Sequence, residues 1–232
     1  MKYANVVEAV FLSRPNRFIA EIELGGEVRR AHVKNTGRCR ELLLPGATVY
    51  VECHPPGSGR KTDFSLIAVQ KGDMLINMDS QAPNKVLEEA LAGGLILPHM
   101  GKPAVKIRRE STIGNSRLDF RLEYGEGRVC YMEVKGVTLE EDGIARFPDA
   151  PTERGVKHIR ELCSLREQGT EACVALLIQM KGVREFRPND ATHPAFGEAL
   201  RDAAARGVSL YAWDSRVTLD AITLDESVPI RL

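Results

Sequence analysis

The chain has 232 residues, of which 43% are hydrophobic and 28% charged, a composition typical of a folded globular protein. Lysine plus arginine and aspartate plus glutamate each number 32, so the formal net charge is zero. This excludes a protein that coats nucleic acid by bulk positive charge, but it leaves room for a local basic groove. No apolar run approaches the roughly 18 residues of a membrane helix, and the start, MKYANVVEAV, lacks the apolar core of a signal peptide. We therefore expect a cytoplasmic protein that makes no membrane contact.

The N-terminal part, residues 1–81, is predicted to be a small closed barrel. Gly25-Gly26 joins two alternating segments into a hairpin, and about one turn of helix precedes Pro45-Gly46. Further short strands are expected at 48–54, 63–72 and 74–78. Five or so short strands with a helical piece midway are typical of an OB fold.

The pattern changes to a helical period at residues 82–94, so the domain boundary is placed between residues 81 and 82. Asn84 is expected to cap this helix, and Gly93-Gly94 to end it. The second domain, residues 82–232, is expected to be an α/β domain with a mixed sheet and helices on both faces. Its expected strands are 104–111, 116–124, 128–139, 171–180 and 208–213, and its expected helices are 152–169 and 193–207.

The second and third of these strands form a hairpin that gathers charged side chains. If the turn centres on Glu126, the antiparallel register sets Asp119 opposite Glu133. Lys135 follows Glu133 by two residues and lies on the same face of the strand. Directly opposed carboxylates repel each other, so this arrangement calls for a compensating cation.

Two interpretations of this hairpin remain open. Arg117 and Arg121 share the face of Asp119, as they would on a solvated, salt-bridged surface. A sheet covered by helices has no wide solvated face, however, and two carboxylates suit Mg²⁺ or Mn²⁺. A lysine beside them could then orient or deprotonate a water molecule.

The pattern D-x(13)-E-x-K across a hairpin resembles the PD-(D/E)xK nuclease superfamily. The words HVKNTGR, PNKVLEEAL, SRLDF, YMEVKGVTL and FPDAPTERGVKHIREL are more specific, and together they resemble the sugar fermentation stimulation protein family (SfsA) over almost the whole chain. The resemblance implies an OB-like barrel fused to a PD-(D/E)xK nuclease-like domain, and binding to DNA.

The resemblance also implies roles for individual residues. Asp119 and Glu133 correspond to metal ligands and Lys135 to a catalytic lysine, while Glu110 and Glu89 match family acids that would complete the metal site. The proline that gives the superfamily its name is replaced by leucine at position 118.

Basic side chains elsewhere are candidates for nucleic-acid contact. Arg154, Lys157 and His158 recur at helical spacing after the hairpin and could meet phosphates or form a solvated helix face. Arg17, Arg38 and Arg40 lie in or beside polar loops of the predicted barrel. The aromatic residues of this part, Phe18 among them, mostly follow apolar patterns typical of core.

These observations predict a DNA-binding protein with a Mg²⁺- or Mn²⁺-dependent phosphodiesterase site, DNA being favoured over RNA. The alternative is a non-catalytic DNA-binding regulator of sugar-metabolism genes that uses the same basic surface. A homodimer is compatible with either function.

Overall fold

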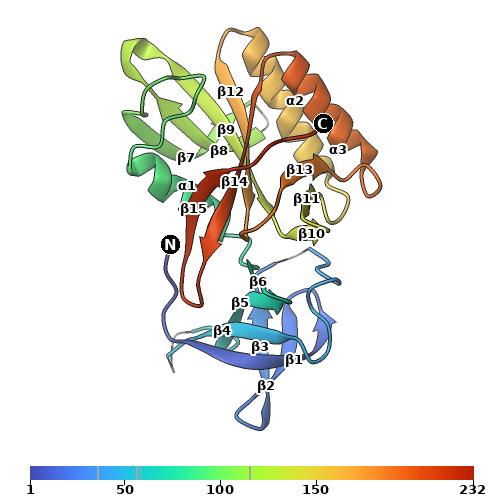
Figure 1. Ribbon diagram of the computed structural model, residues 1–232. Helices are drawn as coiled ribbons and strands as arrows, with labels where there is room; N and C mark the ends of the chain where they lie inside the picture. The colour runs from blue at the N-terminus through green and yellow to red at the C-terminus, as the bar shows by residue number, and fades with distance from the viewer. Residues whose placement is uncertain (36, 56, 58, 115) are drawn as a thin grey trace.

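The computed structural model describes residues 1–35, 37–55, 57, 59–114 and 116–232. The chain forms a β-barrel and an α/β domain that lie one above the other (Figure 1). Within the described ranges, no helix combines the length and the apolarity needed to cross a membrane.

The barrel is built from the β-strands of the N-terminal part. They are β1 (Val6–Asn16), β2 (Ile19–Leu24), β3 (Glu27–Val33), β4 (Thr48–Cys53), β5 (Phe64–Lys71) and β6 (Met74–Asn77). Their order is β3-β2-β1-β4-β5-β6, and a parallel pairing of β3 with β5 closes the barrel. Between β3 and β4, the Leu43 amide bonds the Cys39 carbonyl at 3.0 Å, which is the single helical turn expected there. The predicted OB fold is confirmed.

In its described residues, the α/β domain contains one large sheet, one small sheet and three α-helices. Its helices are α1 (Ala82–Ala92), α2 (Glu153–Glu167) and α3 (Pro194–Ala205). The large sheet consists of β7 (Lys106–Ile113), β8 (Ser116–Glu123), β9 (Val129–Val137), β12 (Glu171–Ile178), β14 (Ser209–Val217) and β15 (Ile222–Ser227). The small sheet consists of β10 (Leu139–Glu141), β11 (Ile144–Phe147) and β13 (Glu185–Pro188).

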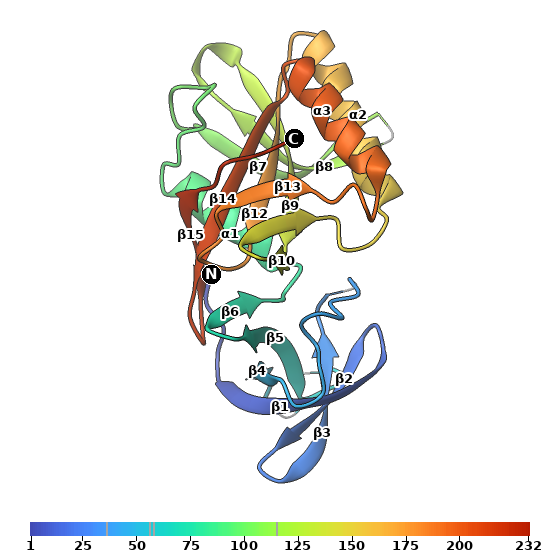
Figure 2. The same ribbon diagram turned by 45° about the vertical axis from the view of Figure 1, so that its right-hand side comes forward.

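The large sheet is mixed, as predicted, in the order β15-β14-β12-β9-β8-β7. Its central strands β9, β12 and β14 run parallel, and the outer pairs are antiparallel. Helices cover both faces: α1 packs on one, while α2 and α3 lie side by side on the other (Figures 1 and 2). Because both faces are covered, β12 reads EACVALLI, and seven of its eight residues are buried.

Three short strands of the small sheet and the edge strand β15 were not expected from the sequence. β10, β11 and β13 have three or four residues each, too few for a clear alternation. Strand β11 also pairs in parallel with β13, about 40 residues further along the chain. Short segments with distant partners carry little local signal.

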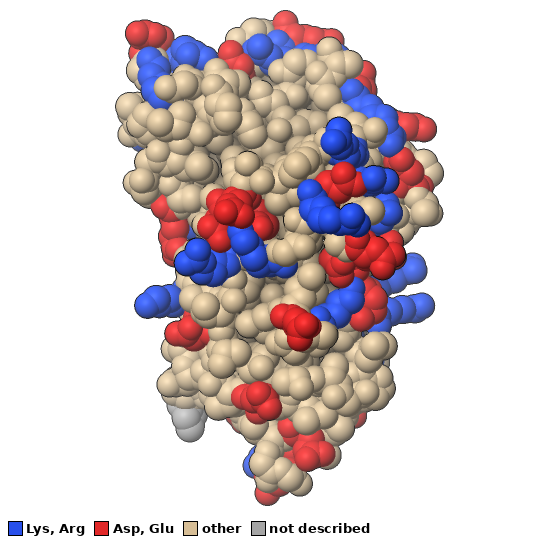
Figure 3. All heavy atoms as spheres, in the orientation of Figure 1, with Lys and Arg blue, Asp and Glu red and all other residues tan. Residues whose placement is uncertain are grey.

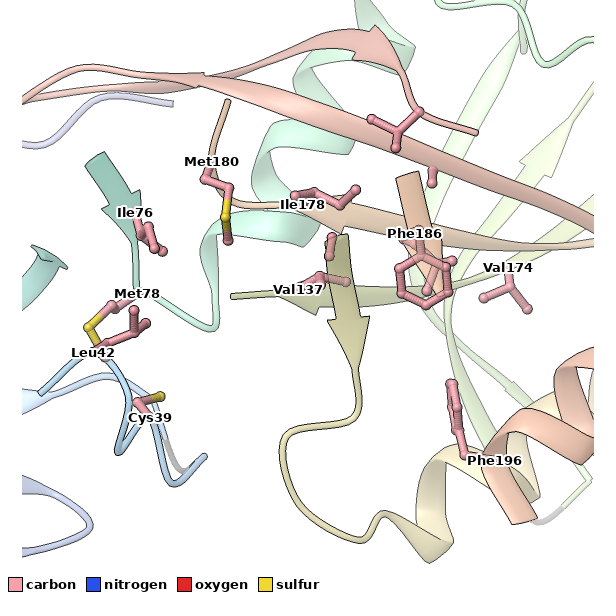
Figure 4. Close-up of a cluster of buried hydrophobic side chains, with 14 of the residues drawn as sticks. Cys39, Leu42, Ile76, Met78, Val137, Val174, Ile178, Met180, Phe186 and Phe196 are labelled. Carbon is pink, nitrogen blue, oxygen red and sulfur yellow. The ribbon is translucent and has the colours of Figure 1, made fainter. Parts of the chain in front are cut away.

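The barrel and the α/β domain share a continuous hydrophobic core. Barrel residues such as Leu42, Ile76 and Met78 belong to the same buried cluster as Ile178 and Met180 of the α/β domain (Figure 4). Polar contacts add to this core. The Gln179 side-chain amide donates to the carbonyls of Asn77 and Asp79 and to the side chain of Asn77, at 2.9–3.1 Å. The barrel is therefore held firmly on the α/β domain.

Candidate active site

The hairpin of β8 and β9 brings two carboxylates together in the register predicted from its turn. Phe120 pairs with Met132 and Leu122 with Cys130, so the same register continued by one residue sets Asp119 opposite Glu133. The backbone ladder ends at Phe120, and beyond it the Asp119 carboxylate accepts the backbone N–H of Val134 at 2.8 Å. The acid thus sits where the two strands part.

Asp119 is held by neutral donors. Besides the Val134 amide, the side-chain amide of Asn84 on α1 donates to its other oxygen at 2.9 Å. Burial and the nearby charge of Glu133 raise the pKa of Asp119, and the two hydrogen bonds oppose this rise only in part. The salt bridges of this face do not include Asp119, because Arg117 pairs with Glu110 and Lys135 with Glu133.

Glu133 lies in a different environment. Its residue is 2% exposed, and one carboxylate oxygen accepts hydrogen bonds from Lys135 Nζ and His158 Nδ1, each at 2.6 Å. Burial alone would raise the pKa of Glu133, but the His158 hydrogen bond and the Lys135 ammonium outweigh it and lower the pKa. The second oxygen, Oε2, is buried and has no hydrogen-bond partner among the described residues.

The described basic residues of α2 divide between this network and the surface. His158 is 5% exposed and bonded to Glu133, so it is not the phosphate contact that helical spacing suggested. Arg154 Nε donates to His158 Nε2 at 3.4 Å, which leaves the ring proton on Nδ1 for the bond to Glu133. Arg154 and Lys157 are exposed and line a shallow hollow with Arg160.

Glu110 and Glu89 do not join the pair. The Glu110 side chain is 59% exposed and lies 3.5 Å from Arg117. Glu89, 60% exposed, pairs with the N-terminal amine of Met1 at 2.5 Å, because α1 turns that position away from Asn84. Across the part of the chain that the structure describes, no group of three or more His, Cys, Asp and Glu side chains could hold a metal ion.

The two carboxylates nevertheless fit a divalent cation. A buried carboxylate oxygen without a partner is costly unless something else binds it, and Glu133 Oε2 is such an atom. Asp119 oxygens that each accept one hydrogen bond still have lone pairs to offer. Mg²⁺ typically takes only one or two protein carboxylates and completes its octahedron with water and substrate phosphate. Asp119 and Glu133 would hold it.

The barrel arginines predicted to contact nucleic acid lie on the surface in one neighbourhood. Arg17, Arg38 and Arg40 are exposed. Arg14, buried in part, donates to the backbone carbonyls of Arg17, Asn35, Gly37 and Arg38 at 2.7–2.9 Å. This one guanidinium therefore ties the loop that carries Arg38 to the turn that carries Arg17.

Sequence reasoning missed two groups that orient the carboxylates. Asn84 was expected to cap α1, but the helix begins at Ala82 after Gln81, so Asn84 lies inside its first turn and reaches Asp119. His158 was expected to meet phosphates or to form part of a solvated helix face. It lies in the stripe of Ile159, Leu162 and Leu165, all buried, and a histidine in such a stripe signals a polar partner inside the fold.

The fold and the site define a class of two-domain proteins in which an OB barrel precedes a mixed-sheet α/β domain with a buried acid pair beside a lysine. Residues 12–78 match the family model of the SfsA N-terminal OB domain, and residues 81–221 match that of the sugar fermentation stimulation protein RE domain. The chain belongs to the sugar fermentation stimulation protein (SfsA) family.

Relatives cover the chain from end to end. A sugar fermentation stimulation protein homolog of Desulfitobacterium hafniense (strain DSM 10664 / DCB-2) is 52% identical over 100% of this chain and 99% of its own. One from Clostridium botulinum (strain Loch Maree / Type A3) is 49% identical over 98% of both chains. The solved structure of Pyrococcus furiosus SfsA in complex with Ca²⁺ is similar with a TM-score of 0.87 and 28% identity, over 100% of this chain and 98% of the other.

Proposed function

We propose that this protein binds DNA and hydrolyses phosphodiester bonds at Asp119, Glu133 and Lys135 with Mg²⁺ or Mn²⁺ as cofactor. The observation that carries the proposal is the buried Oε2 of Glu133, which has no hydrogen-bond partner among the described residues and lies beside Asp119, whose pKa is raised by burial and by the charge of Glu133. The Ca²⁺ complex of the Pyrococcus furiosus relative supports a site for a hard divalent ion.

A divalent cation held by Asp119 and Glu133 would supply Lewis-acid stabilisation of charge on the scissile phosphate. The protein's part is to orient both carboxylates. Asn84 and the Val134 amide orient Asp119, and His158 orients Glu133 and fixes which oxygen is left for the cation.

Lys135 is the group that would act on the reacting atoms. Its side chain is 15% exposed and hydrogen-bonded to Glu133, so it is positioned and partly desolvated. An ammonium there can donate a hydrogen bond to a phosphate oxygen or to the attacking water, in either case where negative charge develops.

The exposed cations supply the surface for DNA. Arg154 and Lys157 on α2 and Arg17, Arg38 and Arg40 on the barrel would meet phosphates, because each is exposed. Acidic and basic side chains are otherwise interspersed over the face seen in Figure 3, consistent with zero net charge and a local binding surface.

A non-catalytic DNA-binding regulator of sugar-metabolism genes is the second candidate. Two observations favour it. Among the described side chains, no third acidic or histidine ligand joins Asp119 and Glu133. The Lys135 ammonium already compensates the charge of Glu133. Such a protein would bind the same DNA surface without turnover.

The deciding experiment incubates single- and double-stranded DNA and RNA with the purified protein in Mn²⁺ or in EDTA. We expect cleavage of DNA in Mn²⁺ only, and its loss in Asp119→Asn and in Lys135→Met. Folded wild-type protein that binds DNA but cleaves no substrate in Mn²⁺ would support the regulator instead.

A further inference from the structure

A hollow of about 390 Å³ opens on the barrel, remote in sequence from the carboxylate pair. It is lined by Phe18, Ile19, His32, Arg60, Lys61 and Thr62, and is called here the Phe18 hollow. Its volume lies within the range of about 300–1,000 Å³ that small-ligand sites occupy.

The Phe18 hollow lies on the surface by which OB folds bind chains. Phe18 comes from the turn between β1 and β2, Ile19 from the start of β2 and His32 from β3. Arg60 to Thr62 come from the segment that leads from β4 into β5. The parallel pairing of β3 with β5 sets His32 beside Ser65 and so brings these segments together. Oligonucleotides and oligosaccharides bind OB folds at the corresponding loops and strands.

The chemistry of the hollow selects between these ligands. The Phe18 residue is 44% exposed, and the Arg17 guanidinium lies 4.7 Å from its ring centroid. No lining residue is acidic, and Arg17, Arg60 and Lys61 form no ion pair with a described carboxylate. An exposed aromatic ring among unpaired cations matches a chain of bases and phosphates, whereas a neutral oligosaccharide would leave the cations unmatched.

Hydrogen bonds lead from the turn beside the Phe18 hollow toward the carboxylate pair. Arg14 joins the Arg17 carbonyl to that of Arg38, and the Arg38 amide donates to Asp149 of the α/β domain at 3.1 Å. Asp149 lies just before α2, whose Arg154 contacts His158 and, through it, Glu133. The hollow and the candidate active site therefore lie at the two ends of one connected series of groups.

We propose that the Phe18 hollow binds single-stranded DNA, with one base stacked on Phe18 and the flanking phosphates met by Arg17, Arg60 and Lys61. The inference rests on the proposed DNA-binding function and adds strandedness to it. Stacking needs a base whose face is open, which a duplex does not offer, so the ring selects unpaired strands.

The test measures binding of fluorescent oligodeoxythymidylate by anisotropy in EDTA, where cleavage cannot interfere. Phe18→Ala should weaken binding about 5- to 150-fold, the range that one base–aromatic stack contributes. Phe18→Trp should retain it. The same Phe18→Ala change should alter binding of duplex DNA, and of an abasic strand of equal length, by less than about twofold, because neither offers a base to stack.

Val28→Ala is the matched control, since Val28 is an exposed apolar residue of β3, 65% exposed and outside the hollow. It should leave single-strand binding unchanged.

Equal binding by Phe18→Ala and wild type would overturn the proposal, as would equal losses on single strands and duplex. A Phe18→Ala protein with unchanged DNA binding and half the wild-type sedimentation mass would assign the hollow to self-association. Asp119→Asn separates the two proposals, because it should lose cleavage and keep single-strand binding.

Discussion

The carboxylate pair of the α/β domain and the Phe18 hollow of the barrel differ in the burial and pairing of their charged side chains. Asp119, Glu133 and His158 are wholly or largely buried and bonded to fixed donors and acceptors. Arg60 and Lys61 are exposed, and neither forms an ion pair with a described acid. Buried charges interact strongly and cost stability when a partner is lost, whereas exposed charges contribute little to folding and remain available for a ligand. The first arrangement suits chemistry and the second suits affinity.

The two regions should differ most in how much stability the protein loses when one charged side chain is replaced by a neutral one. Glu133→Gln should destabilise the protein by about 3 kcal/mol, because it leaves the poorly solvated Lys135 ammonium without a carboxylate. The melting temperature should fall by about 6–12 °C in EDTA. Arg60→Gln in the barrel should change stability by less than about 0.5 kcal/mol. Equal melting temperatures for Glu133→Gln and wild type would contradict the buried network.

The same comparison has a pH dependence. Folding lowers the pKa of Glu133, so its contribution to stability is present above its ordinary pKa and is lost as the pH falls through the lowered value. Wild type should therefore lose stability relative to Glu133→Gln in this acidic window, which unfolding in urea at several pH values would show.

The next largest loss of stability is expected at Gly136 of β9, the strand that carries Glu133 and Lys135, where it approaches the barrel. A Cβ at Gly136 would lie 2.6 Å from Pro83 Cγ and closer still to Gln179 Oε1, whose side chain is fixed by three hydrogen bonds to the barrel. Gly136→Ala should cost about 1–3 kcal/mol by overpacking, measured by urea unfolding. At Gly125 the added Cβ would meet only Lys102 Nζ at 3.5 Å, so Gly125→Ala is the matched control and should be tolerated. Equal stability of the two variants would show that the junction can relax.

A smaller effect, of opposite sign to that of Glu133→Gln, is expected at the other carboxylate. Folding raises the pKa of Asp119, so its ionisation costs stability as the pH rises through the raised value. Asp119→Asn should therefore keep or raise the melting temperature in EDTA, because the amide has no charge that burial and Glu133 disfavour. The new amide can accept from Val134 and donate to a flipped Asn84 amide.

Metal supplies the second measurement on this variant. Mn²⁺ at a hundredfold excess over Kd should stabilise the wild-type protein by about 2.7 kcal/mol and so raise its melting temperature. The melting temperature of Asp119→Asn should not respond to Mn²⁺. A variant that melts clearly lower in EDTA, yet responds to Mn²⁺ as wild type does, would argue against the carboxylate pair as a cation site.

The smallest effect compares single cations of the two domains through the salt dependence of DNA binding. Arg17→Ala and Arg154→Ala should each reduce the slope of log K against log salt by about one unit if each contacts a phosphate. Arg216, 72% exposed and close to Asp225, provides a control on β14 that should not change the slope. If a substitution leaves the slope unchanged, the substituted residue does not contact a phosphate.

Much of the architecture follows from local pattern. The Gly-flanked turn at Glu126 sets the register of β8 and β9, and with it the approach of Asp119 to Glu133, because a hairpin pairs residues that are near in sequence. The alternation along β2 and the 3.6-residue period of α1, α2 and α3 likewise depend only on neighbouring residues. The division at residues 81 and 82 and the roles of the site residues stay predictions.

Only the tertiary structure decided which side chains complete each site. Asn84 and Asp119 are 35 residues apart and Glu133 and His158 are 25 apart, and no local pattern specifies how α1 and α2 are rotated over the sheet. The same applies to Glu89, which that rotation turns toward the N-terminus, and to Phe18, whose apolar pattern suggested core but whose turn leaves it exposed. The sequence by itself determined the longer strands and helices and which acids face each other across one hairpin, because those depend on period and turn chemistry, whereas it did not indicate β10, β11, β13 or β15. Helix rotation, the fit of the barrel on the α/β domain and the exposure of a turn residue depend on packing between distant segments, and so only the folded chain determines them.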